Sequence, residues 1–196
     1  DEDGPIGWDR MGGDIDGDLL TTFNGLTVAL SADGSIVAIG NNLYGSGNLP
    51  YTRIYRSNPD KSEADEDGPI GWDRMGGDIN KEGSYDSGWN VSLSADGSIV
   101  AIGARNNDGN GDDSGHVRIY QHTPNKTEAD KDGPIGWSIL GRDIDGEEAN
   151  YHSGAAVSLS SDGSTVAIGG PINTSQSNDT PRVRVYKFTG WGLGSV

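Results

Sequence analysis

SADGSIVAIG at residues 94–103 decides the fold, because the chain contains this stretch three times. The same ten residues occupy positions 31–40, and SSDGSTVAIG occupies positions 160–169. A short apolar alternation, such as Val91-Ser-Leu93, precedes each copy. Two β-prone runs on either side of an Asp-Gly pair are a strong hairpin signal. Three such hairpins predict a repeat protein.

The hairpin glycines Gly34, Gly97 and Gly163 are 63 and 66 residues apart, a period typical of solenoids, propellers and arrays. The second unit contains four candidate strands. They cover residues 90–94, 99–103, 116–121 and 136–141. We therefore expect an all-β repeat protein of four-stranded antiparallel blades, of the β-propeller type, with three blades in this chain and further blades in a larger ring or array.

Both faces of the expected strand at residues 99–103 are apolar. Side chains alternate along a strand, so Ile99 and Ala101 share one face while Val100 and Ile102 share the other. A sheet with two apolar faces has to be covered on both sides. The sequence thus predicts that each blade is packed between neighbouring blades. The Asp-Gly turn itself fits either a type I turn with a glycine bulge or a two-residue type I′ turn.

Repeated landmarks divide the chain into four parts. Residues 1–23 are expected to hold the fourth strand of a preceding blade, around Trp8, and a connection; the three blades follow at 24–79, 80–144 and 145–196. Polar, charged insertions at 57–69 and 123–134 predict solvated loops, and the third blade lacks this insertion. Residues 1–15 recur letter for letter at 65–79. We therefore expect the chain to start inside a repeat and to be a processed or excised piece of a longer array.

Composition excludes several classes of function. With 14 Lys and Arg against 30 Asp and Glu, the formal net charge is −16, which argues against binding to nucleic acid or to an anionic membrane surface. The absence of cysteine excludes disulfides, thiolate nucleophiles and zinc–sulfur sites. No apolar run is long enough for a membrane helix, so no membrane insertion is expected.

Residues 87–91, SGWNV, followed by IVAIGA at 99–104, resemble the FG-GAP repeat of integrin α-subunit-type β-propellers. The third unit matches with SGAAV at 153–157 and VAIGGP at 166–171. The resemblance implies an extracellular or cell-surface propeller that acts in adhesion or ligand binding. The family's aspartate-rich calcium loop is reduced here to Ser-Ala-Asp-Gly-Ser, so its metal site does not carry over. The single carboxylates Asp33, Asp96 and Asp162 are better explained as turn residues.

Two other groups of oxygen side chains are candidate Ca²⁺ sites, since hard cations bind several converging carboxylate and carbonyl oxygens. After the fourth strand, each unit carries such side chains at alternate positions, with ordinary turn chemistry as the alternative. These residues are Asp14, Asp16 and Asp18; Asp78, Asn80 and Glu82; Asp143, Asp145 and Glu147. The second group, at residues 107–113 of the second unit, resembles half an EF-hand loop. Its candidate ligands are Asp108, Asn110 and Asp112.

The repeated Gly-Trp pairs are interpreted as architecture, since a tryptophan at one position of every repeat is usually core. Trp89 is not repeated and is the candidate for a surface or glycan contact. Sequons at Asn125, Asn173 and Asn178 are candidate glycosylation sites, whereas a fourth at Asn90 lies at the start of an expected strand.

None of the three histidines lies near a nucleophile motif, and phosphate-loop and metalloprotease motifs are absent, so an enzyme is not expected. The sequence favours an extracellular structural or adhesive module that contacts further repeats, identical chains, surface proteins or glycans, with Ca²⁺ as a candidate stabiliser. A glycan-binding propeller, a subunit of a surface filament or sheath, and a hydrolase are the alternatives.

Overall fold

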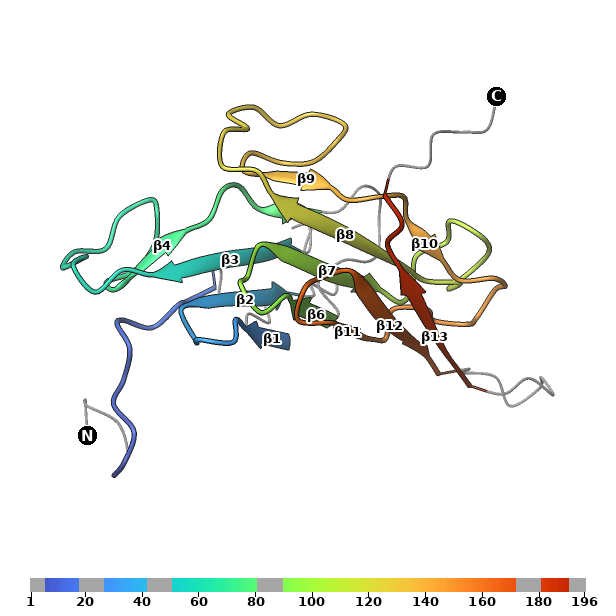
Figure 1. Ribbon diagram of the computed structural model, residues 1–196, viewed down its shortest axis with the longest axis horizontal. Coiled ribbons are helices and arrows are strands. Elements are labelled where there is room, and N and C mark those ends of the chain that lie inside the picture. Colours follow the sequence, from blue (N-terminus) through green and yellow to red (C-terminus); the bar gives the residue numbers. More distant parts are fainter. Residues whose placement is uncertain (1–5, 18–26, 42–50, 81–89, 172–180, 191–196) are drawn as a thin grey trace.

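The computed structural model describes residues 6–17, 27–41, 51–80, 90–171 and 181–190, and these ranges contain strands and turns but no helix. The strands form three antiparallel sheets, one from each repeat, in an open array (Figure 1). The all-β prediction is therefore confirmed. None of the described residues forms a helix long and apolar enough to cross a membrane.

The first and second sheets have the same strand order. The first contains β1 (Thr27–Leu30), β2 (Ile36–Asn41), β3 (Tyr51–Ser57) and β4 (Trp72–Arg74), with β5 (Ile79–Asn80) also paired to β3. The second contains β6 (Asn90–Leu93), β7 (Ile99–Ala104), β8 (His116–His122) and β9 (Trp137–Ile139), with β10 (Ile144–Asp145) also paired to β8. The third contains β11 (Ala156–Leu159), β12 (Thr165–Gly170) and β13 (Arg182–Lys187).

The four strands expected in the second unit all occur, each with its ends within two residues of the expected positions. The sequence did not predict the short fifth strand, β5 or β10, which pairs with the same edge of the third strand as β4 or β9 does. A second difference concerns residues 6–17, where we expected the fourth strand of a preceding blade. These residues contain no strand in the structure.

Each Asp-Gly hairpin closes with a type I turn. In the second sheet Gly97 N donates to Ser94 O at 3.0 Å, and Gly97 has a φ of +68° while Asp96 does not have a positive φ. A type I′ turn needs positive φ at both central residues, so this alternative is excluded. The Asp96 carboxylate accepts hydrogen bonds from the Ser94 hydroxyl (2.7 Å) and from Ser98 N (3.0 Å). Asp33 and Asp162 accept the corresponding bonds in their own hairpins, so all three act as turn residues.

These turns predict a loss of stability in acid. Hydrogen bonds from the preceding serine hydroxyl and from the following serine lower the pKa of Asp33 and of Asp162 from 3.8 to about 2, and that of Asp96 in the same direction. A lowered pKa means that the unfolded chain takes up protons first as the pH falls. The stabilisation is thus complete above about pH 4 and lost as the pH drops toward 2. In urea unfolding at pH 5, 3 and 2, the midpoint concentration should fall with pH, and it should fall less in Asp162→Asn. A midpoint that stays constant with pH would contradict the role of these carboxylates in stability.

The second sheet is covered on both faces, as its apolar pattern predicts. Val91, Val100 and Ile102 pack against Ile36, Ala38 and Ile54 of the first sheet in one buried cluster. On the opposite face, Ala101 and Val117 pack against Val166 and Ile168 of the third sheet in another.

The two interfaces use equivalent residues. Ile36 of the first sheet lies over Gly97 in the second hairpin, and Ile99 of the second sheet lies over Gly163 in the third. The hairpin turns are also joined by backbone hydrogen bonds, from Ala32 N to Ala95 O and from Ala95 N to Ser161 O, both 2.8 Å. The first strands β1, β6 and β11 lie side by side, while the third strands β3, β8 and β13 lie farther out (Figure 1). Successive repeats therefore stack in the same direction.

The repeated tryptophans attach each sheet to the preceding segment of chain. Trp137 is fully buried and its indole N–H donates to Met75 O of the previous repeat at 2.6 Å. Trp72 donates in the same way to Met11 O at 3.0 Å. Both were interpreted from sequence as core residues, and both are buried. Trp8 differs, because it is exposed in the structure.

The insertion loops contain more local structure than their polar sequences indicate. In the second repeat, Lys126 Nζ lies 2.6 Å from an Asp130 oxygen, and Asp130 forms an isolated bridge with Gly133. Lys61 and Asp65 form the same ion pair in the first repeat.

Candidate functional site

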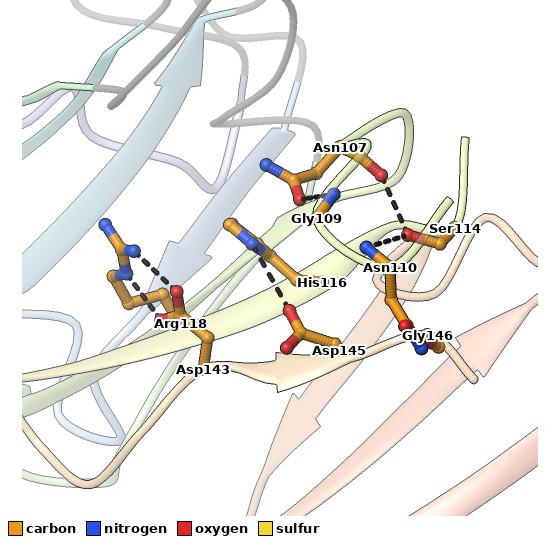
Figure 2. Close-up of polar contacts among 9 residues, drawn as sticks. All are labelled: Asn107, Gly109, Asn110, Ser114, His116, Arg118, Asp143, Asp145 and Gly146. Atoms are coloured by element: carbon orange, nitrogen blue, oxygen red, sulfur yellow. Dashed lines mark hydrogen bonds and ion pairs between the residues drawn. The ribbon is translucent and has the colours of Figure 1, made fainter. Parts of the chain in front are cut away.

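Most of the described candidate residues lie at the polar end of the second sheet, and Figure 2 shows Asn110, Asp143 and Asp145 among them. Arg118 points from β8 toward Asp143, which directly precedes β10. Its Nε and Nη2 atoms contact the two Asp143 oxygens at 2.6 and 2.5 Å. Because β10 pairs with β8 through Ile144 and Val117, the backbone register itself places the carboxylate opposite the guanidinium.

The Arg118–Asp143 pair is half-buried and ionised. Burial alone would raise the pKa of the Asp143 carboxyl, but the hydrogen bonds and charge of Arg118 outweigh it, with a smaller contribution from His116, and the pKa lies below its ordinary value. The same pair occurs in the first repeat, where Arg53 contacts both Asp78 oxygens at 2.6 and 3.1 Å and Arg74 also binds Asp78.

The loop at residues 107–114 lies beside this pair and is organised by its own hydrogen bonds. Asn107 Oδ1 accepts from Gly109 N at 2.8 Å, and Asp108 Oδ1 accepts from Asp113 N at 2.8 Å. The Ser114 hydroxyl donates to Asn107 O at 3.1 Å and accepts from Asn110 N at 3.2 Å. The loop is therefore a compact turn in which the side chains of Asn107 and Asp108 accept hydrogen bonds from the loop's own backbone.

In the second repeat, the structure brings the loop at residues 107–113 next to the acidic positions around β10. The Asn110 side-chain amide donates to Gly146 O at 2.8 Å and to Glu147 O at 3.0 Å. Gly146 N donates to Gly115 O at 2.7 Å, and a Cβ at Gly146 would overlap Ser114 O. His116 Nδ1 lies 3.9 Å from Asp145 Oδ1 (Figure 2). The loop and the segment around β10 thus form one polar surface.

The candidate Ca²⁺ ligands fall into three groups by their surroundings. Asp78, Asp143 and Glu147 are ion-paired with arginines, Glu147 with Arg182 and Arg184 of the third sheet. Asp14 pairs with Arg10 at 2.9 Å, and Asp14 and Asp16 line a polar hollow of about 270 Å³. Asp108, Asn110, Asp112 and Asp145 are exposed.

Other predicted residues cannot be placed. Asp18, Glu82, Trp89, Asn173 and Asn178 lie outside the described residues, as does the side chain of Asn80. Within the described ranges, no group of three or more His, Asp or Glu side chains is arranged to hold a metal ion. Ca²⁺ binding therefore stays a prediction. Of the sequons, Asn125 is exposed in the insertion loop, and the Asn90 side chain accepts a hydrogen bond from Val157 N of the third sheet at 3.1 Å.

The arginine partners of the acidic positions were not predicted from the sequence. Their signal was present, because Arg53 and Arg118 each precede the paired aspartate by 25 residues. An arginine at the same sequence spacing from an aspartate in two successive repeats indicates an ion pair. It is an alternative to reading the aspartate as a metal ligand.

Replacing Asp143 with Asn tests the ion pair. The change removes the charge opposite a half-buried guanidinium, and we expect a loss of about 1–3 kcal/mol in the free energy of unfolding. Chemical unfolding of Asp143→Asn measures this, with the exposed Asp112→Asn as the matched control. If Asp143 acts as the ion-pair partner of Arg118, the loss in the free energy of unfolding is the same in 1 mM CaCl₂ and in EDTA. A loss that appears only in the presence of Ca²⁺ would instead make Asp143 a metal ligand.

Comparison of the sequence with protein-family models and with curated proteins found no match in either case.

Proposed function

We propose that this chain is a structural or adhesive repeat module of the β-propeller type that acts outside the cell or at its surface through protein–protein contacts. The observation that carries the proposal is the second sheet, which has two apolar faces and is covered on each by a neighbouring repeat. Such a sheet serves as one layer of a stack. Its exposed features are polar loops held at fixed relative positions.

The arrangement of strands supports the propeller-type interpretation. The first strands of the three repeats are neighbours, the later strands lie farther out, and successive sheets are related by the same contacts (Figure 1). Such an arrangement is expected of blades that surround a common axis, which supports the proposal. Gly103 of the second repeat packs against Gly154 of the third, so the two halves of the FG-GAP-like motif lie in contact between neighbouring repeats.

The polar surface agrees with a role in contacts. Glu147 in the connection after β10 pairs with Arg182 and Arg184 of the third sheet, so charges join neighbouring repeats at their edges. The loops at residues 57–69 and 107–113 carry several carboxylates, in a chain of net charge −16. A solvated, strongly acidic surface keeps stacked repeats soluble and favours cationic or polar partner surfaces.

The proposal is tested on intact cells that produce the protein. Antibody labelling without permeabilisation should stain the surface, and a membrane-impermeant lysine cross-linker should join the chain to proteins at that surface. Labelling that requires permeabilisation, together with no cross-linked products on intact cells, would overturn the proposal. The permeabilised sample of the same cells is the control for antibody access.

A further inference from the structure

We propose that a second copy of this chain docks head-to-tail on the first, with its third sheet covering the first sheet and pairing with the N-terminal segment 6–15. The inference rests on the proposed stacking function and names the partner. Two surfaces are involved. The leading face is the outer face of the first sheet, with Val28, Leu30, Val37 and Ile39; the trailing face is the outer face of the third sheet, with Thr165, Ala167, Val183 and Val185.

The trailing face is equivalent to surfaces that are buried in the other repeats. Val183 and Val185 are 74% and 66% exposed, whereas Val117, at the position of Val183, is 0% exposed under the third sheet. Ile54, at the position of Val185, is 1% exposed under the second sheet. The trailing face therefore has the pattern of a surface that covers a following sheet.

The leading face is equivalent to the face of the second sheet that the first sheet covers. Val28 and Leu30 are each 61% exposed, while the corresponding Val91 and Leu93 are 5% and 8% exposed beneath the first sheet. The exposed apolar side chains at the two ends of the stack thus belong to complementary halves of one interface. The established interfaces between the sheets supply its geometry.

The hairpin turns define how the two faces fit. Ile36 and Ile99 fill the space over Gly97 and Gly163, to within 2.6 and 2.5 Å of a Cβ built on each glycine, and Gly34 has open space at this position. Thr165 of the second copy, equivalent to Ile36 and Ile99, would lie over Gly34. The backbone bonds between turns continue the same way, with Ser161 N of the second copy donating to Ala32 O.

The N-terminal segment can add a fourth strand to the third sheet, which has three strands in the part of the chain that the structure describes. Its residues 6–10 have the sequence of 70–74, the segment that contains β4. This strand pairs with β3 through Tyr55 opposite Arg74 and Ser57 opposite Trp72. The same register places Tyr186 of the second copy opposite Arg10 and Phe188 opposite Trp8. Asp14, already 2.9 Å from Arg10, would then meet Arg184 as Asp78 meets Arg53.

A hollow between the second and third sheets fits the side chain of Trp8. Trp137 and Trp72 donate to Met75 O and Met11 O, and the equivalent residue for the third sheet is Leu140. Leu140 and Gly141 line a hollow of about 460 Å³ together with Tyr186 and Phe188. Trp8 is 76% exposed in its own chain. In the docked pair, its indole N–H would donate to Leu140 O of the other copy.

Sedimentation velocity of the purified 196-residue chain tests the proposal. Because the two faces differ, the contact is heterologous, and we expect mass to increase with concentration through dimers to rings or filaments. Leu30→Glu on the leading face and Val185→Glu on the trailing face should each weaken association more than about 30-fold, since each buries an unpaired carboxylate. Lys131→Glu, on an exposed loop, is the control. Circular dichroism should show that all variants fold, because both substituted side chains are exposed in the single chain.

Mixing the two variants distinguishes a head-to-tail contact from a symmetric one. The Leu30→Glu chain keeps a sound trailing face and the Val185→Glu chain a sound leading face, so the mixture should form a dimer and nothing larger. Variants that stay monomeric when mixed, or a wild-type chain that is monomeric at all concentrations, would overturn the inference. A chain that is monomeric in vitro would overturn the docking inference without contradicting the proposed surface location. Purely intracellular labelling would overturn the surface location without contradicting self-association.

The role of the N-terminal segment has its own test. A peptide of residues 1–15 should bind the chain at the third sheet and reduce self-association, and the Trp8→Ala peptide should bind at least about tenfold more weakly because it lacks the buried indole. Peptides that bind equally well, or not at all, would overturn the pairing of segment 6–15 with β13. The same peptide is also tested on the Trp191→Ala chain. Binding to this variant but not to the wild-type chain would mean that the chain's own Trp191 occupies the hollow, and the pairing of segment 6–15 with β13 would be overturned.

Discussion

Trp137→Ala is expected to destabilise the chain by about 3–5 kcal/mol, the range for deletion of a buried aromatic side chain. Trp137 is fully buried between the first and second sheets, in the cluster that contains Ile54 and Tyr120. It also stacks at a tilt on His122, with ring centroids 5.0 Å apart, and donates to Met75 O. Truncation leaves a cavity at the interface and an unpaired carbonyl. The midpoint of chemical unfolding, followed by circular dichroism, measures the loss.

Two variants separate the parts of this effect. Trp137→Phe keeps most of the buried area and removes the hydrogen bond, and we expect a smaller loss of about 1–2 kcal/mol. Trp8 follows the same DGPIG stretch as Trp137 but is exposed. Trp8→Ala should therefore leave stability unchanged at concentrations where the chain is monomeric. Equal losses for Trp8→Ala and Trp137→Ala would show that the Gly-Trp segments do not join neighbouring sheets in the way described.

Gly103→Ala is expected to cost about 3 kcal/mol, at the upper end of the range for overpacking. Gly103 lies in β7, where a Cβ would overlap the carbonyl oxygen of Gly154 in the following repeat. Both groups belong to the backbone, so the clash is relieved only by moving the third sheet relative to the second. Thermal unfolding of the variant measures the cost.

Gly77→Ala is the matched control for this change. Its Cβ would meet its nearest neighbours, Ile135 N and Pro134 Cβ, at 3.6 Å, which is ordinary contact. We expect this variant to unfold near the wild-type temperature. If Gly103→Ala behaved like Gly77→Ala, the two sheets would be farther apart than the structure places them.

Much of the fold could be predicted from the sequence, because its determinants are local. The Asp-Gly turn, the alternation through Val91 and Leu93 and the doubly apolar strand at 99–104 repeat three times and define a hairpin with two buried faces. The strand at Ile144–Asp145 could not be predicted in this way. It contains two residues and forms through pairing with β8, a contact between distant parts of the chain.

The polar surface in Figure 2 was less predictable for the same reason. The sequence identifies Asp143, Asp145 and Asn110 as side chains with oxygen atoms at closely spaced positions. Such side chains occur both in metal sites and in turns. The groups that contact them, such as the Arg118 side chain on Asp143 and the Gly146 carbonyl on Asn110, come from other segments. Their positions follow from the register of β8 with β10, which local patterns do not specify.

The central claim is that each repeat is covered by the next through one recurring contact, and NMR tests it most directly. Nuclear Overhauser cross-peaks should join the Ile36 δ1 methyl to the Gly97 α protons and the Ile99 δ1 methyl to those of Gly163. A spectrum that contains the cross-peaks within sheets, such as Val91 to Ile102, but neither of these two would contradict the stacked arrangement.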